Sequence, residues 1–547
     1  MYIIGINSAY HESSVTLLRN GEIVAAAEEE RFTRIKHAKP ANVDNPDQLP
    51  IEALQYCLDT AGIQIQDVEA IGYSMLPEKR LANKDFEDYV IQGDWGSEEG
   101  ENLYLKKLQT IPSKLESMGF NGEFHWISHH MCHAASAFYP SPFEESAVLA
   151  VDGIGETGST LFCYGKGHEL NGFAEIEYPA SLGFLWEKIS MFLGYSEYDA
   201  CKVMGLAGYG DPNRFIDQYK SIVKLVPDGK FELDNEVLRF RVQDFEPLEN
   251  LFSVHKRTPD GEMTQDYKDI AAALQKVTEE TILHMVQYAY EHCKTNALCL
   301  AGGVALNCVA NEILLKQSLF EQIYIQPAAH DGGTSLGAAY YIWHHILQNT
   351  ERVPMKNAYL GPEFTDEEIV KVIKEQGLIY NKVDEIEKEV ARLLSEQNIV
   401  AWFQGRMEFG PRALGNRSLL ADPRKYEMRE RLNHVVKNRE DYRPFAPSVL
   451  AEEANNWFVM DKESSATDFM LMSFKAKDKS KIPSVVHVDG TSRVQTVRRE
   501  ANPRYYRLIS SFYELTGVPM VLNTSYNDRE PIVCTPFDAI KTFKKGR

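Results

Sequence analysis

The chain has 547 residues, of which 44% are hydrophobic and 25% charged, as is usual for soluble globular proteins, and its length predicts two or three domains. Its formal net charge of −21 argues against a broad nucleic-acid-binding surface, which needs clustered cations, but it allows a local basic pocket for a small phosphorylated substrate. No apolar run approaches the ~20 residues that cross a bilayer, and the eight cysteines form no C-x-x-C pair, so we expect a cytoplasmic protein with reduced thiols and no membrane contact.

The N-terminal segment is predicted to begin as a run of antiparallel strands followed by a helix and a further strand. Asn20-Gly21 is the favoured type I′ hairpin turn between two apolar stretches. The expected strands are residues 3–7, 14–18, 22–27 and 68–74, and the expected helix is residues 54–61. This order resembles one half of an actin-like ATPase fold, and we therefore predict an α/β architecture.

Two histidines in the stretch SHHMCHAASAF, residues 128–138, are spaced like metal ligands. If this stretch is helical, His129 and His133 lie on one face, where two imidazoles can bind one metal ion. His130 is offset from that face, so we expect it to contact substrate or to be structural. A helix whose histidines merely pack is the alternative that the spacing leaves open.

Two predicted strands deliver aspartates at their carboxyl ends, where open α/β sheets place their ligand sites. Residues 147–151 lead into Asp152-Gly153, and residues 323–326 lead towards Asp331-Gly332. Together with the two histidines, these carboxylates form a donor set that suits Fe(II), Mn(II) or Zn(II). Asp-Gly is also a common turn after a strand, so the spacing alone does not establish a site.

Two double-glycine turns predict nucleotide binding. Gly302-Gly303, with Asn307 at the start of the next helix, and Gly332-Gly333 each separate an apolar strand from a helix. Glycine lets the backbone approach a phosphate closely, and a helix N-terminus favours negative charge. A long helix at residues 265–293 precedes these turns.

The polar stretch 348–365, which contains Pro354 and Gly361-Pro362, is the predicted domain boundary. We expect one domain at residues 1–350, a linker at residues 351–365 and a second domain at residues 366–547. In the second domain we predict helices at residues 366–375 and 384–396, a strand at residues 399–403, and a mixed α+β remainder.

A basic cluster stands out in this acidic chain, because residues 401–443 hold ten Lys or Arg against six Asp or Glu. Guanidinium groups bind phosphate bidentately, and Lys supplies a compact charge. Lys437 and Arg439 would share a face if their segment is extended, as would Ser525 and Asn527. The alternative is a solvated charged surface.

These segments together resemble the NodU/CmcH family of carbamoyltransferases, which carbamoylate hydroxyl groups of antibiotics, toxins and Nod factors. The resemblance rests on stretches that follow one another along nearly the whole chain: residues 26–37, 128–138, 202–206, 301–311, 405–424, 436–450, 487–497 and 521–527. It implies an actin-like (ASKHA) N-terminal domain and a YrdC-like α/β C-terminal domain. Relatives are also expected to continue beyond Arg547 with a further helix and strand.

The resemblance implies an ATP-dependent O-carbamoyltransferase of antibiotic or other natural-product biosynthesis. The C-terminal domain would join ATP, bound with Mg(II), and carbamoyl phosphate into carbamoyladenylate. The N-terminal domain would then transfer the carbamoyl group to a hydroxyl of a small-molecule acceptor. The metal, an iron in this family, would be held by His129, His133, Asp152 and Asp331.

The remaining site residues follow partly from the resemblance and partly from the residue patterns described above. The transferring carbamoyl group would lie near His11 and Lys36, with His11 as the candidate base, and His130 is a further catalytic candidate. The resemblance implies that Lys437, Arg439, Ser525 and Asn527 bind the adenylate. The glycine-turn pattern adds Gly302, Gly303, Asn307, Gly332 and Gly333 as nucleotide-binding residues. Carbamoyl phosphate would meet Arg412, Arg443 and Arg493.

Two other functions compete with this interpretation. The same two folds in one chain could belong to a tRNA threonylcarbamoyl-modification protein, which the net charge and the 405–424 stretch disfavour. A non-catalytic nucleotide-binding module is the second alternative. The sequence leaves the acceptor and the oligomeric state open.

Overall fold

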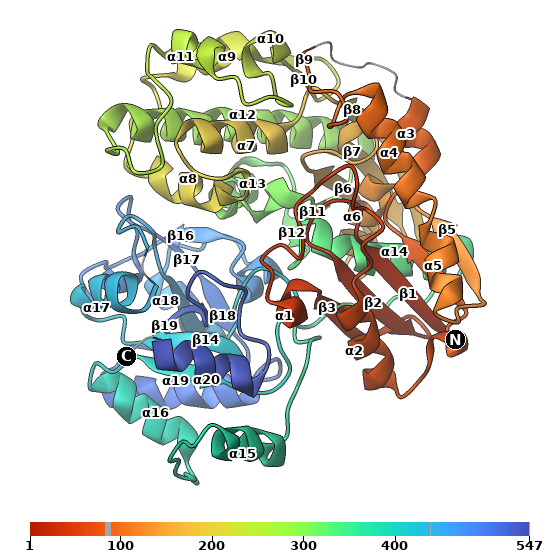
Figure 1. Cartoon of the computed structure of the whole chain (residues 1–547). Coiled ribbons are helices and arrows are strands. Elements are labelled where there is room, and N and C mark those ends of the chain that lie inside the picture. Colours follow the sequence, from red (N-terminus) through yellow and green to blue (C-terminus); the bar gives the residue numbers. More distant parts are fainter. Residues whose placement is uncertain (83–88, 438, 546–547) are drawn as a thin grey trace. The chain divides into compact units, whose positions relative to one another are not determined.

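The computed structural model describes residues 1–82, 89–437 and 439–545. The chain forms two compact units, which we call unit 1 (Met1–Glu29 and His37–Met355) and unit 2 (Glu30–Lys36 and Lys356–Arg547) (Figure 1). The predicted division placed residues 30–36 in the first domain, whereas the structure assigns them to unit 2.

The first sheet of unit 1 has the strand order β3-β2-β1-β4-β5. Its strands are β1 (Tyr2–Asn7), β2 (Ser14–Arg19), β3 (Glu22–Glu28), β4 (Ala70–Tyr73) and β5 (Glu123–Trp126). Strands β1, β2 and β3 form the predicted antiparallel meander around the Asn20-Gly21 turn, while β4 runs parallel to β1 and to β5.

The second sheet of unit 1 repeats this order as β8-β7-β6-β11-β12. Its strands are β6 (Glu145–Val151), β7 (Gly158–Lys166), β8 (Glu169–Glu177), β11 (Ala297–Ala301) and β12 (Gln322–Ile325). Here too a meander joins two further parallel strands. This duplicated topology confirms the predicted actin-like fold class.

Helices cover both sheets of unit 1. The longest is α12, which begins and ends as predicted, and it packs on β6. The helices are α2 (Ile51–Ala61), α3 (Pro77–Ala82), α4 (Glu98–Leu108), α5 (Ile111–Ser117), α6 (His129–Phe138), α7 (Leu182–Phe192), α8 (Ala200–Ala207), α9 (Ile216–Ile222), α10 (Asn235–Leu238), α11 (Glu246–Phe252), α12 (Gln265–Cys293), α13 (Cys308–Gln317) and α14 (Thr334–Tyr340). A separate hairpin is formed by β9 (Val223–Val226) and β10 (Lys230–Leu233).

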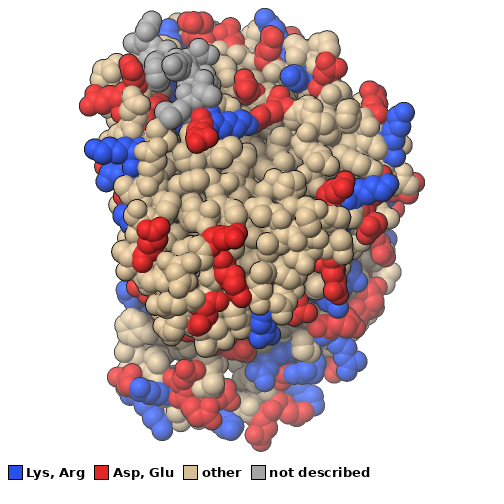
Figure 2. All heavy atoms as spheres, turned by 90° about the vertical axis from the view of Figure 1, so that its right-hand side faces the viewer, with Lys and Arg blue, Asp and Glu red and all other residues tan. Residues whose placement is uncertain are grey.

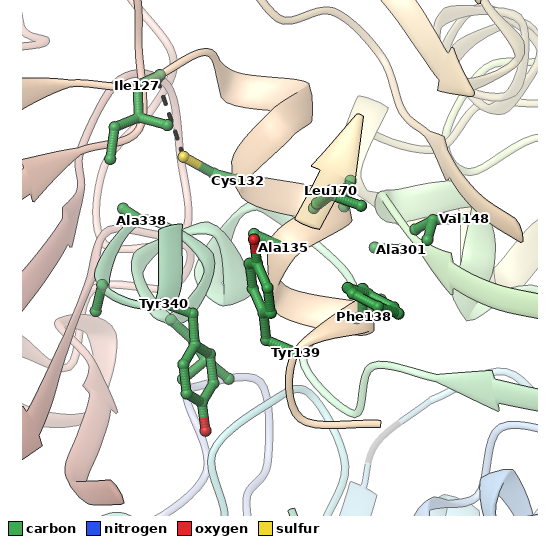
Figure 3. Close-up of a cluster of buried hydrophobic side chains, with 14 of the residues drawn as sticks. Ile127, Cys132, Ala135, Phe138, Tyr139, Val148, Leu170, Ala301, Ala338 and Tyr340 are labelled. Atoms are coloured by element: carbon green, nitrogen blue, oxygen red, sulfur yellow. Dashed lines mark hydrogen bonds between the residues drawn. The ribbon is translucent and has the colours of Figure 1, made fainter. Parts of the chain in front are cut away.

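Helices α6 and α14 pack against each other, α14 also on β1 and β2, and α6 also on β6 and β11. A Cβ on Gly337 of α14 would lie 1.7 Å from the carbonyl oxygen of Cys132 in α6, so only glycine allows this close crossing. Figure 3 shows the buried cluster around the crossing, with Phe138 from α6 and Ala338 and Tyr340 from α14. This packing fixes α6, which carries the predicted metal-binding histidines, between the two sheets.

Unit 2 is a mixed α/β structure around a five-stranded sheet of order β13-β14-β19-β15-β18. Its strands are β13 (Val400–Phe403), β14 (Arg417–Ala421), β15 (Ala446–Leu450), β18 (Gln495–Val497) and β19 (Met520–Ser525), with a separate pair β16 (Ser473–Lys475) and β17 (Thr491–Arg493). Its helices are α1 (Glu30–Thr33), α15 (Asp366–Glu375), α16 (Ile386–Ser395), α17 (Glu427–Arg431), α18 (Ala454–Trp457), α19 (Pro503–Thr516) and α20 (Pro536–Lys545). Helix α15 begins where predicted because Thr365 and Glu368 form a capping box.

Helix α1 and the residues after it belong to unit 2 because their side chains are anchored there. Arg31 donates to the carbonyl oxygen of Gly410 at 2.9 Å, and Arg34 donates to those of Pro531 and Ile532. Phe32 packs on a buried cluster of unit 2. Sequence proximity to β3 gave no sign of these contacts, which are distant along the chain.

Charged side chains are spread over the face shown in Figure 2, and most of the surface between them is uncharged. Acidic and basic side chains are interspersed on this face, so the acidic excess of the chain does not gather there into one patch. None of the described helices combines the length and the apolar content that crossing a bilayer requires.

Candidate metal centre and cationic cluster

Helix α6 brings the two predicted histidines together, as the spacing of four residues requires. His129 and His133 are fully buried, and their rings lie 4.8 Å apart. The Nδ1 atom of His129 lies 3.1 Å from the carbonyl oxygen of Ser74, which can only accept a hydrogen bond. The ring therefore carries its proton on Nδ1 when neutral, and its Nε2 lone pair is left for another partner.

Asp152 and Asp331 follow two parallel strands of the second sheet, β6 and β12, with β11 between them. Their carboxylates meet because parallel strands bring their carboxyl ends to the same edge. Asp331 opens the short 3₁₀ helix η4 (Asp331–Gly333). Asp152 is oriented through its Oδ1 atom, which accepts a hydrogen bond from the backbone N–H of Gly303 at 2.8 Å.

The four side chains converge on one point, since their ligand atoms all lie within 4.8 Å of one another. His129 Nε2 is 3.6 Å from Asp152 Oδ2 and 3.5 Å from Asp331 Oδ1, and His133 Nε2 is 3.5 and 3.6 Å from the same atoms. These separations are long for hydrogen bonds. Four donors placed tetrahedrally at usual metal–ligand bond lengths lie about 3.4 Å apart, so the arrangement fits a metal ion.

The electrostatics of this cluster match a cation site. Burial lowers the pKa of His129, but the carboxylates of Asp331 and Asp152 outweigh it, so that the pKa lies well above its usual value. Burial raises the pKa of Asp152, but His129 and His133 outweigh it and hold the pKa well below its usual value. Among the residues described, neither histidine Nε2 has a hydrogen-bond partner. Buried polar atoms of this kind call for a ligand.

Backbone conformation and close packing require glycine in the two double-glycine turns. Gly302 has φ +87°, and a Cβ there would lie 2.1 Å from the carbonyl oxygen of Val151. A Cβ on Gly333 would lie 2.0 Å from the carbonyl oxygen of Ala328, and one on Gly332 would lie 2.6 Å from the ring of His330. These glycines pack the edge that carries Asp152 and Asp331, and their role in phosphate binding remains a prediction.

The side chain of Asn307 is hydrogen-bonded to other residues of unit 1. Its side chain caps α13 by accepting from the N–H of Ala310 at 3.0 Å. The same amide donates to Gln275 of α12 at 2.9 Å and accepts from it at 3.2 Å. The predicted adenylate contact would therefore compete with a structural hydrogen-bond network.

His130 lies beside the four-residue cluster but does not join it. It is 1% exposed, and within the described part of the chain neither of its ring nitrogens has a hydrogen-bond partner. Burial and then the charge of His129 lower its pKa to about 3, so the ring is neutral at cellular pH. The prediction that it is offset from the ligand face agrees with this geometry, and its catalytic role remains a prediction.

His11 lies in a second group of polar residues in unit 1. Its ring packs edge-on against Tyr198, and the ring of His37 stacks on the same tyrosine with centroids 4.4 Å apart. Glu12 accepts a hydrogen bond from His37 Nδ1 at 2.6 Å. Lys36, the other predicted catalytic residue, is exposed and belongs to the segment of unit 2 that contains α1.

Lys437 and its predicted partners come together in unit 2. The ammonium group of Lys437 contacts the carbonyl oxygens of Ser525 and Asn527, the amide oxygen of Asn527 at 2.7 Å and the hydroxyl of Ser525 at 3.3 Å. The segment is not extended at Lys437, which ends the π-helix η6 (Leu432–Lys437), so the condition for a shared strand face does not hold there. Tertiary contacts, rather than a shared strand face, assemble this group.

Two arginines crowd Lys437 with like charge. Burial, and after it the charges of Arg439 and Arg443, hold the pKa of Lys437 well below its usual value. Arg439 is oriented by Asn433, to which its Nε donates at 2.8 Å, and by the ring of Phe445. Such a cluster is stabilised by an anion, which offsets all three charges.

Arg412 and Arg493, the other predicted carbamoyl phosphate ligands, also belong to unit 2. Arg412 is half-buried in the loop before β14, and its Nε has no hydrogen-bond partner among described residues. Arg493 ends β17, which pairs with β16. Their share in carbamoyl phosphate binding remains a prediction.

Sequence reasoning missed Glu187, on α7. Burial, and then the charges of Asp152, Glu197 and Asp331, raise the pKa of Glu187 to about 8, so a protonated carboxyl lies close to the metal-type cluster. No motif marks this residue, since a single Glu in an amphipathic helix is ordinary. Only its half-buried place near Asp152 in the tertiary structure shows that it differs from a surface acid.

The similarity of this chain to known proteins extends over both units. Family models described as the carbamoyltransferase N-terminus and C-terminus match residues 2–340 and 391–547. An uncharacterised protein of Synechocystis sp. is 38% identical over 100% of this chain and 94% of its own length. The nodulation protein NolNO of Sinorhizobium fredii is 37% identical over 98% of this chain and 77% of its own. The 3'-hydroxymethylcephem-O-carbamoyltransferase of Amycolatopsis lactamdurans is 32% identical over 60% of this chain and 58% of its own.

Proposed function

Because this chain belongs to the carbamoyltransferase family, we propose that it is an ATP-dependent O-carbamoyltransferase with two half-reactions, one in each unit. The observation that supports this most strongly is the convergence of His129, His133, Asp152 and Asp331 in unit 1. In this proposal, the metal site of unit 1 binds the phosphate of the adenylate during transfer. The cationic cluster of unit 2 binds the phosphate groups from which the adenylate is made.

Unit 2 is proposed to form carbamoyladenylate. Atom balance sets the steps: water releases orthophosphate from carbamoyl phosphate, and an oxygen of the remaining carbamate attacks the α-phosphorus of ATP, which expels pyrophosphate. Lys437, Arg439 and Arg443 offset the negative charge that builds on phosphorus. Ser525 and Asn527 hold the Lys437 ammonium in place. Arg412 and Arg493 are proposed to hold carbamoyl phosphate, and Mg(II) accompanies the ATP phosphates.

Unit 1 is proposed to transfer the carbamoyl group to an acceptor hydroxyl. His129, His133, Asp152 and Asp331 would hold a divalent metal, Fe(II) by family resemblance, with Mn(II) and Zn(II) also suited to the donor set. Such a metal supplies Lewis-acid polarisation and an anchor for the phosphate of the adenylate. The Gly302-Gly303 and Gly332-Gly333 turns line the same sheet edge and are proposed to contact the nucleotide.

His11 is proposed to take the proton from the acceptor hydroxyl, since imidazole is a general base near neutral pH. Its Nδ1 is buried without a hydrogen-bond partner in the described chain. Lys36 and His130 are proposed to contact the transferring group. As the acceptor we propose a hydroxyl of a natural product or sugar-like molecule, in line with the relative named for a hydroxymethylcephem.

The test supplies purified protein with ATP, Mg(II), carbamoyl phosphate, Fe(II) or Mn(II), and a panel of hydroxylated metabolites. We expect pyrophosphate, orthophosphate and AMP, and an acceptor whose mass increases by one carbamoyl unit. ADP as the sole nucleotide product would contradict the proposal. Retention of tRNA at moderate salt would instead support the threonylcarbamoyl alternative. An unchanged nucleotide pool with every acceptor would indicate a binding module.

A further inference from the structure

Glu156 is a buried carboxylate in the loop that follows Asp152. It is 1% exposed and lies between β6 and β7. Its Oε1 accepts from the N–H of His129 at 2.7 Å and from the N–H of Leu76 at 2.9 Å, and its Oε2 accepts from the Ser128 hydroxyl at 3.1 Å. Three segments that are distant in the sequence therefore meet on one side chain.

These contacts lie at the N-terminus of the helix that carries the histidines. His129 is the first residue of α6, and Ser128 is its N-cap. The backbone N–H groups of a first helical turn have no partner within the helix, so Glu156 satisfies one that would otherwise be buried alone. The same carboxylate ties this N–H to Leu76, two residues after Ser74, whose carbonyl oxygen contacts the His129 ring.

The loop that carries Glu156 is itself held in place. The hydroxyl of Tyr10 donates to the carbonyl oxygen of Gly155, and Arg80 donates to the carbonyl oxygen of Glu156 at 2.9 Å. Arg80 is fixed in turn by a bidentate ion pair with Glu101 at 2.9 and 2.8 Å. The loop that presents Glu156 to α6 is therefore held by contacts other than those with α6 itself.

We propose that Glu156 is a positioning residue, which sets His129 at the right place relative to Asp152. One loop thus delivers a metal ligand, Asp152, and the contact that places the opposing ligand, His129. Groups that orient a metal ligand commonly change metal affinity 10–100-fold when they are removed, and Glu156 orients His129 through its backbone N–H. This inference depends on the metal role of the four-residue cluster in the proposed function.

A different explanation would rest on charge alone. A carboxylate near a helix N-terminus stabilises the helix dipole and would also attract a cation from several ångströms away. Position and charge can be separated, because Gln keeps the reach of Glu and loses its charge, whereas Asp keeps the charge and loses the reach. The amide oxygen of Gln can accept from both N–H groups, and its amino group can donate to the Ser128 hydroxyl.

The experiment compares Glu156→Gln, Glu156→Asp and Glu156→Ala in the full chain, with Glu169→Ala, an exposed acid of β8, as the matched control. Co(II) serves as the probe, because its affinity and its visible absorption spectrum both report on ligand geometry. We expect Glu156→Gln to stay within about threefold of wild-type affinity, and Glu156→Asp and Glu156→Ala to lose about 10–100-fold with altered spectra. Thermal melting of the metal-free proteins establishes that each variant is folded.

The outcomes separate this inference from the proposed function. Wild-type protein that binds no Co(II) would remove the metal from the proposed function. Wild-type binding with an unchanged Glu156→Ala affinity and spectrum would overturn the positioning role. Wild-type affinity in Glu156→Asp together with a loss in Glu156→Gln would show that charge acts instead. If Glu156→Ala does not fold, the Co(II) affinities of Glu156→Gln and Glu156→Asp still distinguish a positioning role from an effect of charge.

Discussion

The two charged clusters of the molecule differ in how their buried charges are balanced. One is the metal-type cluster of unit 1 (His129, His133, Asp152 and Asp331), and the other is the cationic cluster of unit 2 (Lys437, Arg439 and Arg443). In unit 1, two carboxylates face two imidazoles, so each group stabilises the charged form of its neighbours. In unit 2, Lys437 is buried beside two arginines, and the like charges oppose one another. Opposite charges therefore stabilise one another in the first cluster without a ligand, whereas in the second cluster a bound anion would offset the like charges.

The largest effect is expected when one predicted metal ligand is removed from the metal-type cluster of unit 1. His133→Ala leaves two buried carboxylates opposite one imidazole, and we expect metal affinity to fall by at least ~100-fold. Carbamoyl transfer should be lost, while pyrophosphate release in unit 2 continues. Metal analysis and separate assays of the two half-reactions measure this, with His255→Ala as a control on an exposed residue. Equal loss of both half-reactions would contradict the division between the units.

The converse change acts on the cationic cluster. Lys437→Ala removes a donor that offsets charge on phosphorus, and we expect pyrophosphate release to fall about 10²–10³-fold. Metal content should not change, and Arg412→Ala should act in the same direction. The exposed Arg504→Ala is the matched control, and melting curves exclude unfolding. Normal pyrophosphate release by Lys437→Ala would place adenylate formation elsewhere.

A smaller effect is expected in the pH dependence of the free energy of unfolding. In the metal-free protein the raised pKa of His129 contributes stability at pH values below its unfolded pKa of about 6.5, and this contribution is lost as pH rises through the raised value. The lowered pKa of Asp152 contributes stability above about pH 3.9, which is lost as pH falls through the lowered value.

Metal competes with these protons, since imidazole binds a metal only when its Nε2 is deprotonated. We therefore expect metal binding to release protons and the apparent affinity to rise with pH, by up to about tenfold per unit for each proton released. Calorimetry in two buffers of different ionisation enthalpy measures the protons. Identical heats in both buffers would show that the histidines are already deprotonated.

The mildest change tests whether α1 belongs to unit 2. Phe32→Ala removes a partly buried ring from the cluster of Met407, Ala413, Ile532 and Cys534, and we expect unit 2 to lose about 1–2 kcal/mol of stability. Denaturant unfolding with limited proteolysis can follow the two units separately. The exposed Phe537→Ala is the control, and selective loss of stability in unit 1 would contradict the assignment.

Much of the local structure follows from the sequence, and the failures have a common cause. The hairpin at Asn20-Gly21, helix α12 and the capping box of α15 were predictable, because turn chemistry, apolar periodicity and capping act over a few residues. The place of residues 30–36 was predicted wrongly, and the extended segment that would give Lys437 and Arg439 a shared face is not formed. Both depend on partners that are distant along the chain.

The sequence by itself determined that His129 and His133 share a helix face and that aspartates follow two apolar strands, because helical and strand periodicity are local properties. Only the tertiary structure decided that these four groups meet within 4.8 Å, that Glu156 joins α6 to the loop of Asp152, and that Lys437 lies among Ser525 and Asn527. The physical reason is that distances between segments are set by the packing of whole sheets and helices, which no short stretch of residues encodes.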